Sequence, residues 1–434
     1  MGCSPNCGLI TVATIGAVLA VLGAILIPVG NHFIDKTVEK EVVIENGTIA
    51  YQNWVLPGSP IYREFWVFDV QNPEDVMQNG SAPIFKQKGP YTYRMRYIPK
   101  QNITEHKDAT LSYLQPNIFI FQPDMSAGPE NDTFTTVNLA VVTAPVLYKN
   151  GFMQFLMDIW MRSAKSKLLQ TRTVKEILWG YEDPFLKKIP IIKIDKVVGI
   201  FYPVSMISEG KINFRGCDLK ESIYGTAFHP FVKKSEQLYF FSSDICRSIY
   251  GFFDRDLTVK DIPLYRFSIP PSAFASAFTN PDNICFCTER VVSRNCTTSG
   301  VLDVSSCKQG RKPVYISLPH FLHGSQRIFQ FVKGMEPNVE EHTTFLDVEP
   351  ITGFTLAFSK RLQVNLLVQN NPKITLGQWE TAIITDEKAE FFRSKVTNKI
   401  KLLNLLQLTL MIVGSVMFLG FLFAFFMCKG KSRK

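Results

Sequence analysis

The sequence predicts a membrane protein in which two spanning helices hold one large, mostly antiparallel β ectodomain between them. Three observations support this fold class. A long apolar run without one charged side chain lies near each end, at Gly8–Val29 and Leu402–Met427. Stretches rich in β-branched and aromatic residues, separated by Gly, Pro and Asn, recur between these runs. The same interior region, 30–401, holds every glycosylation sequon and six of the nine cysteines.

The two apolar runs predict membrane-spanning helices. Each exceeds the roughly 20 residues that a helix needs to cross a hydrocarbon layer about 30 Å thick. A cleaved signal peptide is a weaker interpretation of the first run, because 1–7 carries no basic side chain and the run exceeds the usual apolar core of about 7–15 residues. Two buried core helices are weaker still, since such helices usually keep a polar face. Two crossings place both tails, 1–7 and 428–434, on one side of the membrane.

Glycosylation sequons indicate which side of the membrane the interior region faces. Basic residues flank the second run on both sides, so the charge asymmetry of the loops does not decide it. The pattern Asn-X-Ser/Thr occurs between the runs and in neither tail. We therefore expect a glycosylated extracellular ectodomain, cytoplasmic tails and a plasma-membrane location. The predicted sites are Asn46, Asn79, Asn102, Asn131 and Asn295.

The interior cysteines predict disulfides. Six of them lie from Cys217 to Cys307, and an even number in one block is typical of an oxidising compartment. A zinc site is the alternative, but the gap between Cys285 and Cys287 is not the usual ligand spacing and no histidine pair follows. The six residues permit about 15 pairings. We expect Cys285 and Cys287 to have different partners.

The remaining three cysteines lie beside the apolar runs, on the side expected to be reducing. They are Cys3, Cys7 and Cys428. A thiol within reach of the headgroups there can be acylated. We predict palmitoylation of all three, with an unmodified thiol as the alternative.

One segment, 144–180, departs from the strand pattern. Its residues Phe152, Phe155, Ile159 and Trp160 recur at helical spacing, which predicts two or more consecutive helices. Within 145–175 six basic residues accompany one acid, an excess of five positive charges that equals the excess of the whole ectodomain. We interpret this as a focused field for an anionic partner. A solvated helix face is the alternative for the charges, and a buried stripe is the alternative for the apolar residues.

Cationic and apolar side chains together predict an amphiphilic ligand, such as a long-chain fatty acid, an oxidised phospholipid or a lipoprotein surface. Alkyl burial would supply about 0.8 kcal/mol per methylene, and a Lys or Arg would orient the carboxylate. No catalytic fingerprint occurs, so we expect neither an enzyme nor a cofactor. His320 and His323 could share a helix face, but their flanking residues favour a strand end over a metal site. Nucleic acid is a poor candidate partner for an extracellular membrane protein.

Several motifs make the sequence similar to a known family. They are GPYTYR at 89–94, WGYEDPF at 179–185, FFSSDICR at 240–247, CFCTE at 285–289 and YISLPHF at 315–321. Together they resemble the class B scavenger receptors over most of the chain. The resemblance implies a β-barrel ectodomain with a helical apex that receives ligand, and an internal lipid tunnel toward the outer leaflet. It also implies transfer of lipid to the membrane lipids and binding of thrombospondin-like extracellular proteins.

The resemblance also implies roles for individual residues. It implies disulfides Cys217–Cys285, Cys246–Cys307 and Cys287–Cys296, acylation of the tail cysteines, and phosphorylation of Thr92. Phe152 matches an exposed apical phenylalanine used in adhesion. A lysine-rich family segment appears here as Arg162-Ser-Ala-Lys165, so Ser163 stands where relatives have an acyl-reactive lysine. We expect the ligand-binding residues to be Phe152, Arg162, Lys165 and Lys167.

Two stretches, 202–217 and 368–386, are shorter than in typical members of this family, where they hold barrel strands. Loss of paired strands would leave backbone groups unsatisfied or open an edge into the tunnel. The alternatives to a lipid receptor are therefore an adhesion or signalling receptor, and a divergent or shortened isoform with impaired lipid transport. A lysosomal member would carry an acidic dileucine-type signal, which 428–434 lacks.

Overall fold

The structure, a computed structural model, divides into two units. It describes 5–95, 98–105, 111–116, 118–147, 150–190, 195–201, 207–209, 228–288, 296–305, 313–366, 374–383 and 385–431. The first unit comprises 1–51, 258–263 and 385–434, and the second comprises 52–257 and 264–384. The expected ectodomain, 30–401, therefore contributes residues to both units.

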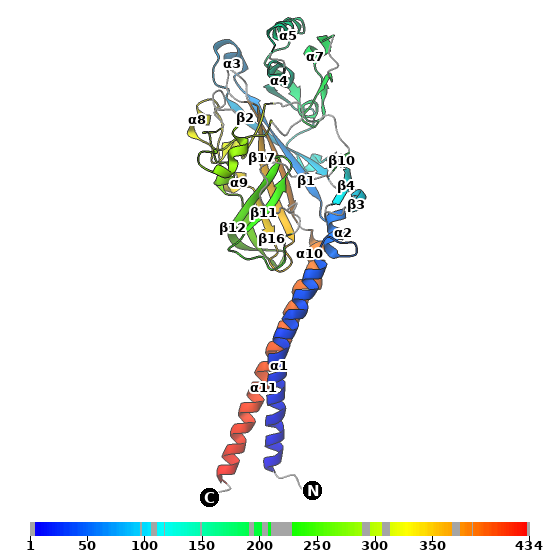
Figure 1. Cartoon of the computed structure of the whole chain (residues 1–434), viewed down its shortest axis with the longest axis vertical. Helices are drawn as coiled ribbons and strands as arrows, with labels where there is room; N and C mark the ends of the chain where they lie inside the picture. The colour runs from blue at the N-terminus through cyan, green and yellow to red at the C-terminus, as the bar shows by residue number, and fades with distance from the viewer. Residues whose placement is uncertain are drawn as a thin grey trace. The chain divides into compact units, whose positions relative to one another are not determined.

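The first unit contains two long helices, α1 (Pro5–Glu41) and α11 (Asn398–Lys431), which lie side by side (Figure 1). The short α10 (Asp386–Phe392) and a π-helical turn (Arg393–Thr397) lead into α11. Two helical stretches, Gly8–Glu41 and Asp386–Met427, are long and apolar enough to span a membrane, with mean hydropathies of 2.6 and 2.5. Both predicted runs lie within them, as a two-span membrane protein requires.

Glycine brings α1 and α11 together. Gly16 and Gly23 lie seven residues apart on α1, a spacing that keeps them on the seam of a helix pair. A Cβ atom at Gly16 would lie 2.5 Å from the backbone N of Phe418, and one at Gly23 would lie 2.9 Å from that of Met411. On α11, a Cβ at Gly414 would lie 2.3 Å from the backbone N of Ala20. Small residues thus permit backbone-to-backbone packing, which drives helix association in lipid.

One polar side chain lies in this seam. Gln407 of α11 is buried, and its Nε2 donates a hydrogen bond to the Leu26 carbonyl of α1 at 2.8 Å. Gly30 provides the space, because a Cβ there would lie 2.5 Å from Gln407 Nε2. An amide in hydrocarbon is costly without a partner, so this bond favours one alignment of the helices.

The second unit is built around an eleven-stranded sheet. Its order is β11-β12-β13-β16-β17-β18-β1-β2-β5, and β15 joins β14 to β17. The described strand registers are antiparallel, as predicted. The strands are β1 (Ile61–Val70), β2 (Phe85–Met95), β5 (Ile120–Phe121), β11 (Gln237–Ser242), β12 (Arg247–Val259), β13 (Ile262–Ser268), β14 (Leu302–Asp303), β15 (Val314–Ser317), β16 (Phe345–Val348), β17 (Thr355–Leu366) and β18 (Ile374–Ile383).

Three smaller sheets and several short helices complete the second unit. The small sheets are β10-β4-β3, β6-β7 and β8-β9. Their strands are β3 (Gln101–Glu105), β4 (Leu111–Pro116), β6 (Thr133–Val137), β7 (Leu169–Thr173), β8 (Tyr181–Glu182), β9 (Val197–Val198) and β10 (Ile207–Glu209). The helices are α3 (Pro73–Asn79), α4 (Leu139–Leu147), α5 (Gly151–Ser163), α6 (Val174–Trp179), α7 (Pro184–Lys188), α8 (Gln326–Phe329) and α9 (Val339–His342), while α2 (Ile49–Val55) links the two units.

The described strands do not show the expected barrel. Among the described residues its strands form an open path from β11 to β5, and no closed sheet is seen. Within the shortened stretch 368–386, β18 is present and pairs with both β17 and β1. In the other shortened stretch, β10 pairs with β4. The shortening has therefore left paired strands in both places.

An aromatic cluster fixes the helical segment to the sheet. Tyr93 on β2 has its ring centroid 5.0 Å from that of Trp179 at the end of α6, and the indole Nε1 donates to the Tyr93 hydroxyl at 3.2 Å. Phe65 on β1 packs edge-on against both rings. Tyr93 in turn donates to Glu130 at 2.7 Å. These contacts hold the C-terminal end of the 144–180 segment against the sheet.

Two buried imidazoles stack in the second unit. The rings of His320 and His342 are 4.6 Å apart and nearly parallel, at 7°. The Nδ1 of His320 accepts a hydrogen bond from the backbone N–H of Glu336, and the Nδ1 of His342 accepts one from Asn338, both at 3.0 Å. His320 Nε2 also bonds to Gln87 on β2. His323 does not join this pair, contrary to the shared helix face considered above.

Burial lowers the pKa of His320 to about 4, with a smaller contribution from His342. Burial, helped by Arg361 on β17, likewise lowers the pKa of His342 to about 4. Glu340 and Glu341 are the nearest acids in sequence, in the helix of His342 itself. Because the neutral rings are favoured in the fold, their stabilisation is present above the unfolded pKa of about 6.5 and is lost as pH falls toward 4.

We expect the second unit to lose stability between pH 7 and pH 4.5 through this pair. His342→Asn keeps an acceptor for the Asn338 N–H but cannot titrate, so it should lower the melting temperature at pH 7 and reduce its fall in acid. Thermal unfolding of the full chain in detergent, followed by tryptophan fluorescence at several pH values, measures this. An unchanged pH dependence in the variant would contradict the assignment.

We also expect Gly414→Leu to separate the spanning helices toward the roughly 8–10 Å between axes that larger side chains impose. Gly420→Leu is the matched control, because no atom lies within 4 Å of a Cβ at Gly420. Spin labels at positions 36 and 399, attached through bio-orthogonal side chains, report the distance in lipid nanodiscs. Equal distances in both variants would show that the seam does not set helix separation.

Candidate functional site

The helical apex predicted at 144–180 contains α5 and α6, but a strand interrupts it. β7 occupies Leu169–Thr173 and pairs antiparallel with β6. At the start of α5, the Asn150 side chain accepts a hydrogen bond from the Phe152 N–H at 3.0 Å, as an N-cap does. At the start of α6, Thr173 and Glu176 form a capping box. The local sequence thus defines both helix starts.

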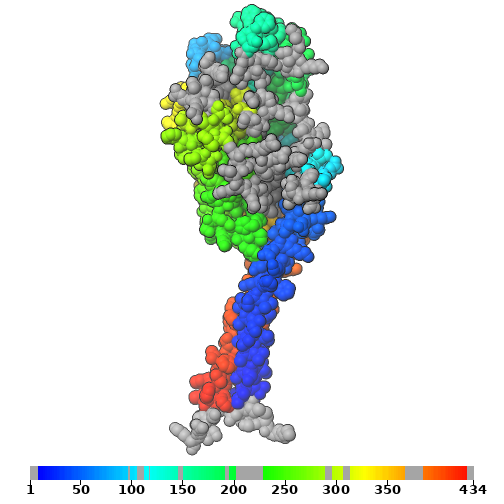
Figure 2. All heavy atoms as spheres, in the orientation of Figure 1, coloured from blue at the N-terminus to red at the C-terminus, as the bar shows by residue number. Residues whose placement is uncertain are grey.

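The apolar face of α5 points outward. Phe152, Phe155 and Ile159 are 67%, 61% and 43% exposed, at the spacing of one helix face. Met157 is almost completely buried and packs with Phe185 of α7 in a separate small core. Figure 2 shows 151–163 on the surface of this unit. The buried-stripe interpretation is therefore wrong for these three residues, and an exposed apolar helix face is typical of a binding surface.

Lys165, two residues after the end of α5, adopts the left-handed conformation. Its φ is +52°, and its N–H donates to the Arg162 carbonyl at 3.0 Å. The N–H of Ser166 reaches the Met161 carbonyl at 3.0 Å, which closes the helix end. Glycine usually takes this position because a Cβ costs about 1–2 kcal/mol there. A lysine is retained at that cost, with its side chain exposed.

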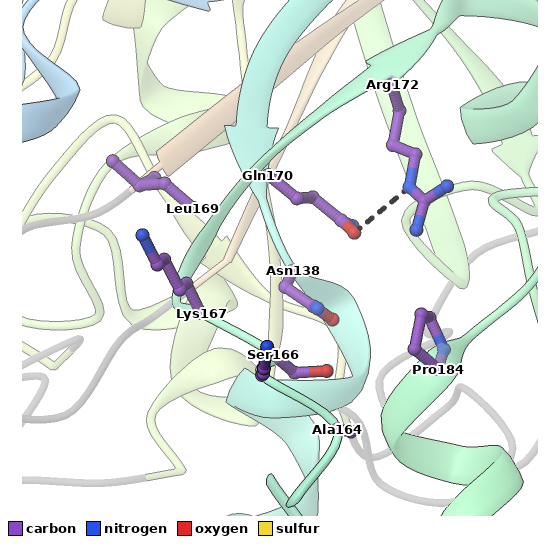
Figure 3. Close-up of a pocket in the computed structure, with 9 residues that line it drawn as sticks. Asn138, Ala164, Ser166, Lys167, Leu169, Gln170, Arg172 and Pro184 are labelled. Atoms are coloured by element: carbon purple, nitrogen blue, oxygen red, sulfur yellow. Dashed lines mark hydrogen bonds between the residues drawn. The ribbon is translucent and has the colours of Figure 1, made fainter. Parts of the chain in front are cut away.

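Beside this helix end lies a hollow of about 170 Å³. Its lining residues are Asn138, Ala164, Lys165, Ser166, Lys167, Leu169, Gln170, Arg172 and Pro184. Figure 3 shows Gln170 and Arg172 joined by a hydrogen bond, with Asn138 between them and Ser166, and with Lys167 extending away from Arg172. Two of the expected ligand-binding residues, Lys165 and Lys167, therefore meet at one hollow.

The other two expected residues lie outside the hollow. Arg162 is the last residue but one of α5 and pairs with Asp158 at 2.9 Å. Its side chain is highly exposed, so this pair is weak and the guanidinium stays available to a stronger anion. Phe152 is ten residues earlier, about 15 Å along the helix axis. The expected set thus splits into an apolar helix face and a cationic end.

The sequence interpretation did not single out Asn138, Gln170 or Arg172. Arg172 lies 4.2 Å from the centre of the Tyr181 ring and bonds to Gln170 at 3.2 Å and Glu176 at 3.5 Å. Burial raises the pKa of Tyr181 to about 12, so the ring stays neutral. The count of basic residues in 145–175 included Arg172, but the sequence did not indicate that it lines the same hollow as Lys167.

The remaining predicted sites are mostly at the surface or outside the described residues. Asn46, Asn79, Asn102 and Asn131 are exposed, and Asn295 lies outside the described ranges. Thr92 is fully buried, and its hydroxyl donates to the Met125 carbonyl at 2.7 Å. Phosphorylation there, which stays a prediction, would require this part of β2 to open.

The cysteines form disulfides where the structure describes them. Cys287 and Cys296 are bonded to each other, with Cα atoms 4.5 Å apart. Cys246 and Cys285 are also disulfide-bonded. The partners expected for them, Cys307 and Cys217, lie outside the described residues, as does Cys3. The side chains of Cys7 and Cys428 are not described either, so palmitoylation stays a prediction. No cluster suited to a metal ion occurs in the described part of the chain.

The chain matches the model of the CD36 family over 14–217 and 211–425. It is 31% identical over 471 residues to Lysosome membrane protein 2 of Homo sapiens, covering 98% of this chain and 96% of the relative. It is 30% identical over 390 residues to Scavenger receptor class B member 1 of Rattus norvegicus, covering 82% and 75%. None of these names is that of an enzyme. With matches along nearly its whole length, the chain belongs to the CD36 family, whose members here are class B scavenger receptors.

Proposed function

We propose that this protein is a scavenger receptor that captures long-chain fatty acids, oxidised phospholipids and lipoprotein lipids at its apex. One observation carries the proposal: α5 has an exposed apolar face, and a hollow lined by Lys165, Lys167 and Arg172 lies beside its C-terminal end. The names of its relatives place it among receptors and membrane proteins. A ligand with an apolar chain and an anionic head matches this order of side chains.

The two parts of the apex have different energetic roles. The hollow, at about 170 Å³, is smaller than the roughly 300–1,000 Å³ of a typical small-molecule site, so it suits a headgroup rather than a whole lipid. Lys165 and Lys167 would pair with the carboxylate or phosphate. The acyl chain would then lie against Phe155 and Phe152, gaining about 0.8 kcal/mol for each methylene buried.

The proposal extends to delivery and location. Captured lipid would pass through the ectodomain, by the internal tunnel that the family resemblance implies, to the outer leaflet of the plasma membrane. The open sheet path is compatible with such a route only if other segments enclose it.

We expect Arg162→Glu, Lys165→Glu and Lys167→Glu together to lower binding of oxidised phosphatidylcholine vesicles at least about tenfold, because three desolvated charge contacts become repulsive. The matched control reverses Lys86, Lys196 and Lys233, three exposed lysines elsewhere. Binding is measured on unpermeabilised cells after antibody staining. Equal binding by both triple variants would remove the apex from lipid capture, and a lack of surface staining would contradict the proposed location.

A second candidate is an adhesion receptor for thrombospondin-like extracellular proteins. The observation in its favour is the same exposed pair, Phe152 and Phe155, because exposed aromatic residues are typical anchors of protein interfaces. Such a receptor would need neither the cationic hollow nor a tunnel. The two candidates therefore differ in whether the cationic residues or the exposed aromatic rings contribute most to ligand binding.

Phe152→Ser with Phe155→Ser should weaken lipoprotein capture about tenfold or more. Burying each phenylalanine ring on binding contributes about 1.5–3 kcal/mol of binding free energy, which the serine variants lose. The fold should persist because both rings are exposed. Phe278→Ser is the matched control, as Phe278 is 88% exposed away from the apex in sequence. Unchanged lipoprotein capture with lost binding of a thrombospondin-type domain would favour the adhesion receptor.

A further inference from the structure

We propose that the outer flank of α11 forms a second ligand site, which binds anionic phospholipid headgroups in the leaflet on the ectodomain side. The site consists of Lys395, Lys399 and Lys401, called here the lysine collar. This inference does not depend on lipid capture at the apex, because it rests on residues of the first unit alone.

The position of the collar follows from helix geometry. The apolar run of α11 begins at Leu402, directly after Lys401. At about 1.5 Å per residue, Lys401 lies within about 2 Å of the run and Lys399 within about 5 Å. The headgroup layer is roughly 5–8 Å thick on each side of the hydrocarbon. Both ammonium groups are therefore at headgroup level, and Lys395 lies one turn farther out.

The charge at this flank is uncompensated. Glu390 is the last acidic residue of the chain, so four basic residues between 393 and 401 have no acid among them. The corresponding flank of α1, 30–41, carries two lysines with three acids, and Lys36 pairs with Glu39 at 3.2 Å. One helix therefore meets the headgroups with balanced charge and the other with a concentrated positive charge.

Among the described residues, the lysines of the collar are not paired with acidic side chains of the protein. Arg393 is committed, because its Nη1 lies 2.8 Å from Asp261 and also bonds to the Lys260 carbonyl. Lys395 lies 5.9 Å from the centre of the half-exposed Phe391 ring. Within the described residues, Lys399 and Lys401 have no carboxylate at ion-pair distance, and both are exposed. Their charge is directed to the surroundings of the helix.

A phospholipid is the occupant that fits. Lysines near a span usually accumulate on the cytoplasmic side, so a collar on the expected extracellular side needs a different cause. The apolar surface directly below it, beginning with the two-thirds exposed Leu402, must contact acyl chains. A phospholipid with an anionic headgroup meets both requirements, because its headgroup pairs with the lysines and its acyl chains contact the apolar surface below them. Each lysine near an anionic lipid surface contributes about 1 kcal/mol to the attraction.

Spin-labelled lipids test the collar in the full chain, reconstituted in phosphatidylcholine vesicles. The four basic residues of the 428–434 tail are changed to Gln so that the other leaflet contributes no selectivity. Electron paramagnetic resonance then measures the association of labelled phosphatidylserine with the protein relative to labelled phosphatidylcholine. We expect a preference of about threefold or more, which 1 M NaCl reduces.

Lys399→Gln with Lys401→Gln should bring this preference close to one, whereas Lys399→Arg with Lys401→Arg should retain it. Lys36→Gln with Lys40→Gln is the matched control on α1 and should leave it unchanged. Equal association of both lipids with the parent protein, or a preference that survives the Gln pair, would overturn the proposal. All four positions are exposed, so the fold should tolerate these changes. An unchanged melting temperature of each variant would exclude misfolding as the cause of a lost preference.

Discussion

The close contact between α1 and α11 is the constraint on which the rest of the structure depends. In hydrocarbon, backbone groups must be satisfied within a helix, and helices then associate through packing rather than through the hydrophobic effect. Glycine on both helices removes the side chains that would hold the backbones apart. The chain between the spans is therefore tethered at two neighbouring points, and the ends of the intervening ectodomain must return to the same place.

At the apex, the exposure of the apolar residues, more than their composition, indicates a role in binding. The small core beneath α5 is filled by Met157 and its neighbours, which leaves Phe152 and Phe155 with no interior to enter. Lys165 occupies a backbone conformation suited to glycine at the point where the apolar face ends. A surface that keeps aromatic rings in water and a lysine in a costly conformation is consistent with selection for binding rather than for stability.

The spans and the helix at 151–163 could be predicted because their signals are local: long runs without a charged side chain in one case, and apolar residues at helical spacing in the other. β7 could not, because its partner β6 is distant in sequence; Thr135 and Thr171 meet across 36 residues with their hydroxyl oxygens 3.0 Å apart. The hollow was missed for the same reason, since β7 supplies Gln170 and Arg172. The outward direction of Phe155 was also beyond the sequence, because an apolar face has the same period whether it points in or out.

The glycine seam has a consequence for register. A repeat of seven residues in Gly16, Gly23 and Gly30 looks alike after a slide of one repeat, about 10 Å along the axis, so glycine packing alone accepts more than one alignment. Gln407 opposes slides of other lengths, because its amide needs the space that a glycine leaves beside an acceptor carbonyl, as Gly30 does near Leu26. A buried polar side chain thus restricts the stagger of the two helices, as a buried asparagine does in a coiled coil.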